Sequence, residues 1–317
     1  MDFREQKTGD AGRDEPAPPE AGGPGRKPDW LKKRLPPADS LRRMEGLLRD
    51  RGLHTVCESA LCPNLGECFH RGTATFLIMG DVCTRNCSFC GVTTGRPGPL
   101  DDEEPRQVAD AVATLGLKHV VVTSVTRDDL PDGGAAHYVA TLRAIGERMP
   151  TTTVEVLTPD FQGSVACLEL VLAARPAVFN HNLETVPRLY PTVRPQAIYE
   201  RSLGVLRHAA LYSGTLVKTG WMVGLGEQQE EVRALLQDAA KAGVHMVTIG
   251  QYLRPSKGHL QVAEYVSPEV FDRYREWGEA LGLQVHAAPF VRSSFQAGES
   301  FAQAHRERGS GGAPSGR

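Results

Sequence analysis

Six of the seven cysteines in this chain are grouped in two compact triplets. The first triplet, in "CESALCPNLGEC", consists of Cys57, Cys62 and Cys68, and the second triplet, in "CTRNCSFC", consists of Cys83, Cys87 and Cys90. A structural zinc ion needs four nitrogen or sulfur ligands, usually in two close pairs. Neither triplet contains a histidine at that spacing, and His70 is the closest candidate. An iron–sulfur cubane fits better, because three cysteines hold three irons and leave the fourth iron open to a substrate.

The second triplet has the spacing C-x3-C-x2-C, with Phe89 before its last cysteine. This motif resembles the cluster-binding motif of the radical S-adenosylmethionine superfamily, in which the open iron binds the amino and carboxylate groups of the cosubstrate. The resemblance implies that an electron from the cluster breaks the sulfonium C–S bond. The resulting 5′-deoxyadenosyl radical then takes hydrogen from an unactivated C–H bond. Because the cofactor carries this step, the protein has to position the reagents and exclude water.

Both triplets together, C-x4-C-x5-C followed by C-x3-C-x2-C, resemble the lipoyl synthase family over roughly residues 27–297. The matching blocks are "KPDWLKKRLP", "RDDLPDGGA", "NHNLETVPRLY", "KTGWMVGLGE", "TIGQYLRPSKGHL" and "PFVRSSF". The resemblance implies a sulfurtransferase that inserts two sulfur atoms, at C6 and C8 of an octanoyl chain on a carrier-domain lysine. It also implies that two molecules of S-adenosylmethionine are used and that an auxiliary [4Fe–4S] cluster is consumed as the sulfur source.

The resemblance assigns one [4Fe–4S] cluster to each triplet. The second triplet would hold the cluster that binds S-adenosylmethionine. The first triplet would hold the auxiliary cluster, together with a serine of the motif Arg292-Ser293-Ser294-Phe295. By resemblance we place this ligand on Ser294, although the sequence alone leaves Ser293 open. Arg292 is assigned a catalytic role, and Phe295 stands where the family commonly has a tyrosine, so no role is expected for that hydroxyl.

Residues near the ends of predicted strands are candidates for binding S-adenosylmethionine. We assign this role to Phe89, Thr123, Asp129, Asn180, Asn182, Glu184 and Lys218. The alternative for the acidic and amide residues is to cap the following helix, because such side chains accept hydrogen bonds from helix N-termini. Lys218 lies within a predicted strand, where a buried ammonium group needs an anionic partner.

Continuous apolar runs alternate with amphipathic segments along the middle of the chain, which predicts βα units and a parallel sheet. The predicted strands are 73–80, 119–124, 152–157, 177–180, 215–224, 245–250 and 284–289, and the predicted helices are 101–116, 134–148, 163–174, 196–212, 227–242 and 267–281. About six units are too few for a closed eight-stranded barrel, so we predict an α/β fold with an open, partial (β/α)6 TIM-like barrel. Chemistry in such folds gathers at the carboxyl ends of the strands, and the loop 83–90 directly follows the first strand.

The composition divides the chain into five predicted regions. Residues 1–28 and 306–317 are rich in Gly, Pro and charged residues, so both are expected to be disordered tails. Residues 29–72 are an N-terminal extension with the first triplet, 73–289 are the barrel, and 290–305 are a C-terminal segment with the serine ligand. The two extensions together are expected to hold the auxiliary cluster.

Charge and hydropathy limit the kinds of partner. The formal net charge of −2 gives no broad cationic face for nucleic acid, and no apolar run reaches the roughly 18–20 residues of a membrane span. The start of the chain has no apolar leader, so we expect a cytoplasmic location with reduced cysteines. The resemblance implies octanoylated lipoyl carrier domains as partners, on 2-oxoacid dehydrogenase E2 subunits and the glycine-cleavage H protein. It also implies an electron donor such as ferredoxin or flavodoxin and an iron–sulfur carrier protein, but neither nucleic acid nor membrane.

Two other classes of protein agree less well with these residues. A radical sulfur inserter of the biotin synthase type would draw its auxiliary ligands from cysteines spread along the barrel strands, and this chain lacks them. A two-cluster electron carrier would be short and fully cysteine-ligated, which does not agree with a chain of 317 residues and two incomplete ligand sets.

Overall fold

The computed structural model of the chain describes residues 26–32, 38–70 and 75–310. Most of the two predicted disordered tails, residues 1–25 and 311–317, therefore lies outside the described residues. None of the helices in the described ranges is long and apolar enough to cross a membrane.

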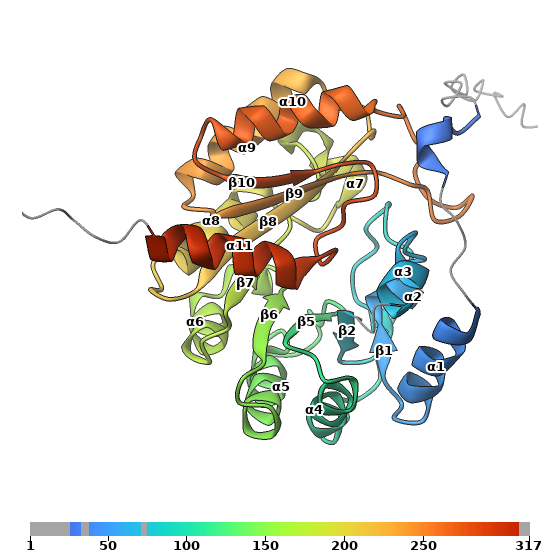
Figure 1. The fold of residues 1–317 in the computed structure, drawn as a ribbon, viewed down its shortest axis with the longest axis vertical. Coiled ribbons are helices and arrows are strands. Elements are labelled where there is room, and N and C mark those ends of the chain that lie inside the picture. The colour runs from blue at the N-terminus through green and yellow to red at the C-terminus, as the bar shows by residue number, and fades with distance from the viewer. Residues whose placement is uncertain (1–25, 33–37, 71–74, 311–317) are drawn as a thin grey trace, which may run out of the picture.

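An open sheet of parallel strands forms the centre of the molecule (Figure 1). Its strands, in spatial order, are β1 (His54–Thr55), β2 (Thr75–Ile78), β5 (His119–Ser124), β6 (Thr153–Leu157), β7 (Val178–Asn180), β8 (Leu216–Val223), β9 (Met246–Gln251) and β10 (Gln284–Ala287). Strand β1 is antiparallel to β2, and all other pairs are parallel. Within the described ranges β1 and β10 each pair with one neighbour only, so the sheet stays open and the predicted partial barrel is confirmed.

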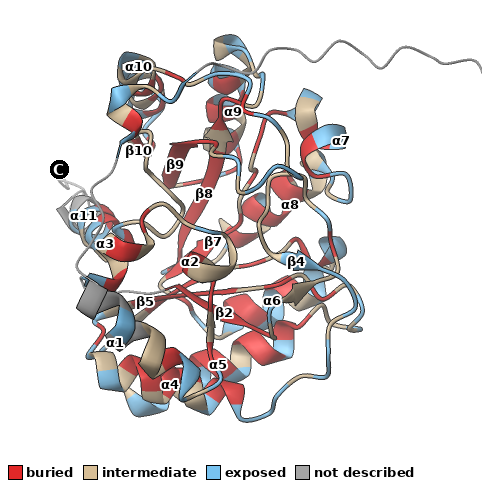
Figure 2. Cartoon of the chain, turned by 90° about the vertical axis from the view of Figure 1, so that its right-hand side faces the viewer, coloured by how far each residue is buried: buried red, intermediate tan, exposed pale blue. Residues whose placement is uncertain are grey.

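One main helix connects each parallel strand to the next. These helices are α4 (Glu104–Leu115), α5 (Ala135–Arg148), α6 (Val165–Ala173), α8 (Tyr199–Ala209), α9 (Gln229–Lys241) and α10 (Pro268–Glu279). Each had been predicted within three residues of these bounds. Helix α4 illustrates the reason, because it buries Val108 and Val112 at helical spacing and ends at Gly116, whose φ of 61° is the left-handed C-cap that favours glycine. Figure 2 shows the buried residues along the strands and on the sheet-facing sides of these helices.

Several short elements had not been predicted. The segment before β2 contains η1 (Asp29–Leu31), α1 (Ala38–Arg49), α2 (Val56–Ser59) and α3 (Leu65–His70). The loop that carries the second triplet, here called the cluster loop, contains β3 (Val82–Cys83) and β4 (Thr93–Thr94). The turns η2 (Phe161–Gly163), η3 (Pro187–Leu189) and α7 (Tyr190–Val193) follow β6 and β7. Apart from α1, which has the same length as α4, these elements are too short for a period of apolar residues to become visible in the sequence.

The C-terminal helix α11 (Ala297–Ser310) lies across the inner side of the sheet, over β7 and β8 (Figure 1). Phe301 stacks on His119 of β5 with 5.4 Å between ring centroids, and Ala304 is buried against apolar residues of β7, β8 and β9. The helix extends to Ser310. Residues 306–310 are therefore helical, which corrects the prediction of a disordered tail from residue 306.

Candidate active site

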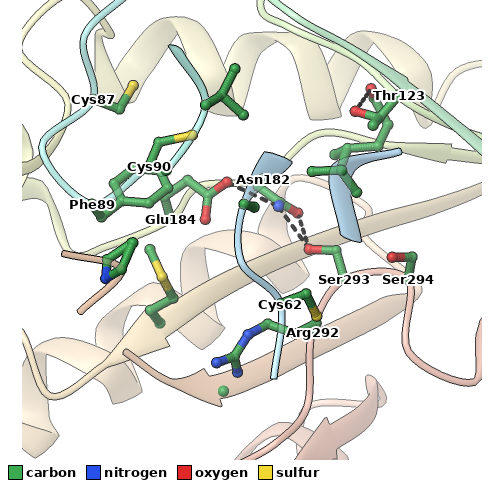
Figure 3. Close-up of a pocket in the computed structure, with 18 of the residues that line it drawn as sticks. Cys62, Cys87, Phe89, Cys90, Thr123, Asn182, Glu184, Arg292, Ser293 and Ser294 are labelled. Atoms are coloured by element: carbon green, nitrogen blue, oxygen red, sulfur yellow. Dashed lines mark hydrogen bonds between the residues drawn. The ribbon is translucent and has the colours of Figure 1, made fainter. Parts of the chain in front are cut away.

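The carboxyl ends of the parallel strands surround a cavity of about 460 Å³, here called the first cavity. Cysteines of both triplets line it, as do residues from the ends of β5, β6, β8 and β9 and from the segment Val291–Ser294. In Figure 3, Cys87, Phe89 and Cys90 lie on one side of this space, and Cys62 and the Arg292-Ser293-Ser294 segment lie on the other. The two ligand sets thus face one shared space, and the loop 83–90 lies at the carboxyl ends of the strands, as predicted.

Hydrogen bonds stabilise the cluster loop, which carries the second triplet. Strand β3 pairs with β4, so the loop is closed at its base around residues 83–94. The thiol sulfur of Cys83 accepts the backbone N–H groups of Arg85 (3.4 Å) and Thr126 (3.3 Å). Such donors stabilise a ligating thiolate and influence the potential of the cluster that it holds.

Two outer loops hold the same cluster loop from the side. The backbone N–H of Ser88 donates to the carbonyl oxygen of Val193 (2.9 Å), and Leu260 donates to Ser88 (3.1 Å). The Nε2 of His259 lies 2.9 Å from the carbonyl oxygen of Cys90, and because a carbonyl only accepts, Nε2 carries the hydrogen. The loops after β7 and β9 therefore determine where the second triplet is positioned.

Arg85, between the first two cysteines of the second triplet, was missed by the sequence analysis. Its guanidinium group is buried and donates to Asp128 (2.6 and 2.9 Å) and to Asp160 (2.6 Å). Burial alone would raise the pKa of Asp160, but the hydrogen bonds and charge of Arg85 outweigh it and lower the pKa to about 2. Arg85 thus fastens the cluster loop to the ends of β5 and β6.

The first triplet lies on α2, α3 and the turn between them, and the C-terminal segment reaches it there. The side-chain amide of the buried Asn64 donates to the carbonyl oxygen of Phe290 (2.7 Å). All three cysteines, together with Ser294, line a second cavity of about 360 Å³. The structure therefore brings the predicted fourth ligand to the first triplet, although Ser294 follows Cys68 by more than 200 positions.

The two serines of the motif face different groups. The side-chain nitrogen of Asn182 donates to the Ser293 hydroxyl (2.7 Å), and that hydroxyl lies 3.0 Å from the Asn182 side-chain oxygen (Figure 3). The Ser294 hydroxyl has no hydrogen bond among the described residues, and Ser294 lines both cavities. Ser293 is thus engaged with the barrel, whereas the oxygen of Ser294 is available beside the first triplet.

Two strand glycines make room for this C-terminal segment. A Cβ on Gly250 of β9 would lie 2.1 Å from the carbonyl oxygen of Val291 and 2.9 Å from Arg292. A Cβ on Gly220 of β8 would lie 2.4 Å from the Thr248 hydroxyl and 3.1 Å from the Ser293 hydroxyl. No other residue type fits at these positions unless the segment moves, so both glycines serve close backbone approach.

The donor sets fit clusters better than single metal ions. In the part of the chain that the structure describes, no three His, Cys, Asp or Glu side chains converge on one point that could hold a metal ion. A cubane needs a spread set, because each thiolate binds a different iron. None of the seven cysteines, all of which lie in the described residues, forms a disulfide bond, and burial raises the pKa of Cys57 and Cys90 to about 12. These thiols are neutral on their own and bind as thiolates when a metal supplies the positive charge.

Four of the predicted S-adenosylmethionine contacts line the first cavity. They are Phe89, Thr123, Asn182 and Glu184. Glu184 has a φ of 64°, which is unusual for a residue other than glycine, and it accepts a hydrogen bond from Asn182 (3.0 Å). Its burial raises the pKa of its carboxyl, while the charge of Arg194 opposes this rise. A strained, half-buried carboxylate that lines a cavity is typical of a binding site.

The other three predicted contacts are not among the residues that line the first cavity. Asp129 is bound by Arg127 (2.9 Å) beside the loop after β5. Lys218 donates to Glu155 (2.9 Å) in the barrel interior, and Asn180 donates to the same carboxylate (3.3 Å). Glu155 is the anionic partner that a buried lysine requires, so these side chains stabilise the barrel below the cavity.

Arg194 is a further cavity residue that sequence analysis missed. Its guanidinium group is buried, lines the first cavity and donates to the carbonyl oxygens of Asn182 (2.9 Å) and Leu183 (3.2 Å). It follows α7, an element with no apolar period, so only its place after the "NHNLET" block could have indicated it. Arg292 lines both cavities, and burial lowers the pKa of its guanidinium group.

Comparisons with known proteins agree with this geometry. The model of the radical SAM superfamily matches residues 77–239. A lipoyl synthase of Caldanaerobacter subterraneus subsp. tengcongensis is 57% identical over 274 residues, which are 86% of this chain and 96% of the relative. The lipoyl synthase of Rubrobacter xylanophilus is 54% identical over 282 residues (88% of each chain), and that of Thermus thermophilus is 53% identical over 282 residues (88% of this chain and 87% of the relative).

Solved structures share the fold at low sequence identity. Methylornithine synthase has a TM-score of 0.50 at 14% identity, over 90% of this chain and 95% of that chain. SuiB of Streptococcus suis, bound to S-adenosylmethionine, has a TM-score of 0.53 at 10% identity, over 71% of this chain and 53% of that chain. These likenesses show the partial barrel, and the sequence relatives show the family. The chain belongs to the lipoyl synthase family of the radical S-adenosylmethionine superfamily.

Proposed function

We propose that the chain inserts sulfur at C6 and C8 of an octanoyl chain attached to a lysine of a lipoyl carrier domain, with both triplets as cluster sites. The observation that supports this most strongly is the first cavity, which residues of both triplets and Ser294 line together. A carbon radical formed on one side of this cavity would meet a sulfur source on the other side without leaving it.

The chemistry requires two clusters with different tasks. When bound, a [4Fe–4S] cluster at the second triplet supplies the electron that cleaves S-adenosylmethionine, and one at the first triplet with Ser294 supplies sulfide. A hard oxygen ligand among soft thiolates is expected to be the easiest to release, which suits a cluster that is consumed. Membership of the superfamily implies the first of these clusters and S-adenosylmethionine, whereas the auxiliary cluster is part of this proposal.

The residues of the first cavity would then bind and orient both substrates. Asn182 and Glu184 would present an amide and a carboxylate to the polar end of S-adenosylmethionine. The Thr123 hydroxyl, which donates to the carbonyl oxygen of Leu157, would keep its oxygen as an acceptor beside them. Val56 and Leu61 of the N-terminal extension give the cavity an apolar wall for an octanoyl chain. Closing such a site against water protects a radical from side reactions.

The carrier and the reductant are proposed at the level of class. An octanoylated carrier domain, such as that of a 2-oxoacid dehydrogenase E2 subunit or the glycine-cleavage H protein, would present its lysine arm at the mouth of the first cavity. Lys27 and Arg254 line that cavity and could contact acidic groups of the carrier. A ferredoxin or flavodoxin would supply electrons, and an iron–sulfur carrier protein would restore the auxiliary cluster.

Mass spectrometry of an octanoylated carrier peptide after one anaerobic turnover tests the proposed function. We expect a gain of two sulfur atoms per peptide, together with about eight irons per chain before turnover, which corresponds to two cubanes. About four irons per chain would contradict the two-cluster part. An unmodified octanoyl peptide would contradict the assigned substrate and would favour a radical enzyme that inserts sulfur elsewhere.

A further inference from the structure

The second cavity has an inner end and an outer end of different character. The first triplet, Asn64 and Ser294 line the inner end. The outer end is lined by the exposed residues Gly116, Lys118, Gln296 and Glu299, which come from the start of β5 and the start of α11. Cys68 of α3 lines the same cavity as Ala297, Gly298 and Glu299 of α11. The cavity therefore extends from the auxiliary ligands to the surface of the molecule.

The auxiliary ligands form a wall between the two cavities. Cys57, Cys62, Arg292 and Ser294 each line both the first and the second cavity. Cys68 lines only the second cavity, and none of the second triplet reaches it. A group held at the first triplet would thus show one side to the substrate cavity and the opposite side to the second cavity.

The proposed reaction consumes the auxiliary cluster that these ligands would hold between the two cavities. Iron has to leave after each turnover, and new iron and sulfide have to arrive. During and after turnover the first cavity holds the acyl chain and the products of the cosubstrate, so it is a poor path for ions. The second cavity contains none of the residues assigned to S-adenosylmethionine or to the acyl chain.

We propose that the second cavity is the route by which iron and sulfide leave and reach the auxiliary site, separate from the substrate cavity. This inference rests on the proposed auxiliary cluster. Lys118 and Glu299 lie at the outer end, where both are exposed, so larger side chains there should narrow the opening without touching a ligand. Contact between Gly298 and His119 shows that the two segments adjoin, since a Cβ on Gly298 would lie 3.1 Å from the His119 side chain.

The test measures the rate at which the auxiliary site takes up iron. The full chain with Cys83→Ala, Cys87→Ala and Cys90→Ala retains only the first triplet. This variant is mixed with sulfide and with equal amounts of ferrous and ferric iron, which is the composition of a [4Fe–4S]²⁺ cluster. Cluster assembly is followed by ⁵⁷Fe Mössbauer spectroscopy. Adding Lys118→Trp and Glu299→Trp should slow assembly about tenfold while the final content of about four irons is unchanged, because a narrowed passage limits access.

The matched control narrows the other cavity. Leu61 lines the first cavity, is 64% exposed and lies next to Cys62, so Leu61→Trp perturbs the same segment from the opposite side. We expect Leu61→Trp and added octanoyl peptide to leave the assembly rate unchanged. If they slow assembly, or if the Lys118/Glu299 variant assembles at the parent rate, the route is not the second cavity. If the parent takes up no four-iron cluster, the auxiliary site itself, and with it the proposed function, fails instead.

A second measurement applies if the Trp variants do not fold. A ferrous chelator is added to the unaltered holoenzyme with and without S-adenosylmethionine and octanoyl peptide, in the absence of reductant. Filling the first cavity should protect the cluster of the second triplet only, so that about half of the iron is lost at an unchanged rate. Protection of all the iron would contradict a separate route.

Discussion

Ser293 and Ser294 are neighbours in the chain, yet the structure gives them different partners. Ser293 exchanges hydrogen bonds with the Asn182 amide, whereas Ser294 lines the second cavity together with the first triplet. A ligand oxygen has to be free to bind a metal, so this difference favours Ser294. The sequence alone could not separate the two, because both stand in the same motif and the deciding contact lies 111 positions away.

Alanine substitutions at these two serines should therefore affect iron differently. Ser294→Ala is expected to leave the auxiliary site without its oxygen ligand and to lower the iron content from about eight towards about four per chain. Ser293→Ala should keep about eight irons and weaken the orientation of Asn182 instead. Iron analysis with Mössbauer spectroscopy measures both, and loss of iron in Ser293→Ala alone would reverse the assignment.

The Arg85–Asp160 pair predicts how stability changes with acid. The pKa of Asp160 is lowered to about 2 in the folded chain from an ordinary value of 3.8, so the pair stabilises the fold fully above about pH 4. This contribution is lost as the pH falls from about 4 to about 2, which removes about 2 kcal/mol. In Asp160→Asn this loss should be missing.

Urea unfolding of both proteins between pH 2 and pH 7 measures this difference. Acid also damages iron–sulfur clusters, but that effect is common to both proteins and cancels in the difference between their free energies of unfolding. A constant difference across this range would show that Arg85 does not hold the Asp160 carboxylate in its charged form.

Strands β8 and β9 show how an element can be adapted to the segment that packs on it. Each carries a glycine, Gly220 and Gly250, where the C-terminal segment crosses the strand at short distance. The strands themselves were predictable from continuous apolar runs, but the reason for their glycines was not. For Gly250 it depends on Val291 and Arg292, and for Gly220 in part on Ser293, all of which follow only after further helices and strands.

Gly250→Ala should displace the C-terminal segment and with it the serine ligand. A new Cβ would lie 2.1 Å from a backbone oxygen, which no side-chain rotation relieves, so we expect a loss of about 1–3 kcal/mol of stability. Auxiliary iron should be lost while the cluster of the second triplet persists. Gly146→Ala in α5 is the control, because its Cβ meets open space and alanine favours a helix. Equal iron loss in both variants would contradict this explanation.

For the whole molecule, the βα repeat and the position of the cluster loop could be predicted from the sequence. The long-range contacts that hold the site together could not. Alternating apolar runs determine the strands and helices locally, so their order and the open barrel followed from them. Arg85, Asn64 and His259 were missed because their partners are distant in sequence, such as Phe290, which follows Asn64 by 226 positions. The direction of the Lys218 side chain could not be predicted either, because a strand residue can point towards the cavity or into the barrel interior. Lys218 points into the interior, where it donates to Glu155.

The two triplets are fastened to different parts of the chain, so mutation should separate their tasks. The second triplet is fastened to loops of the barrel, while the first triplet is fastened to the C-terminal segment through Asn64 and Phe290. Cys87→Ala should thus abolish cleavage of S-adenosylmethionine and all sulfur insertion. Cys62→Ala should retain some cleavage, seen as 5′-deoxyadenosine by chromatography, and yield no sulfur-containing peptide. A thiolated peptide from Cys62→Ala would exclude the first triplet as the sulfur source, and loss of cleavage in both variants would show that the two sites depend on each other.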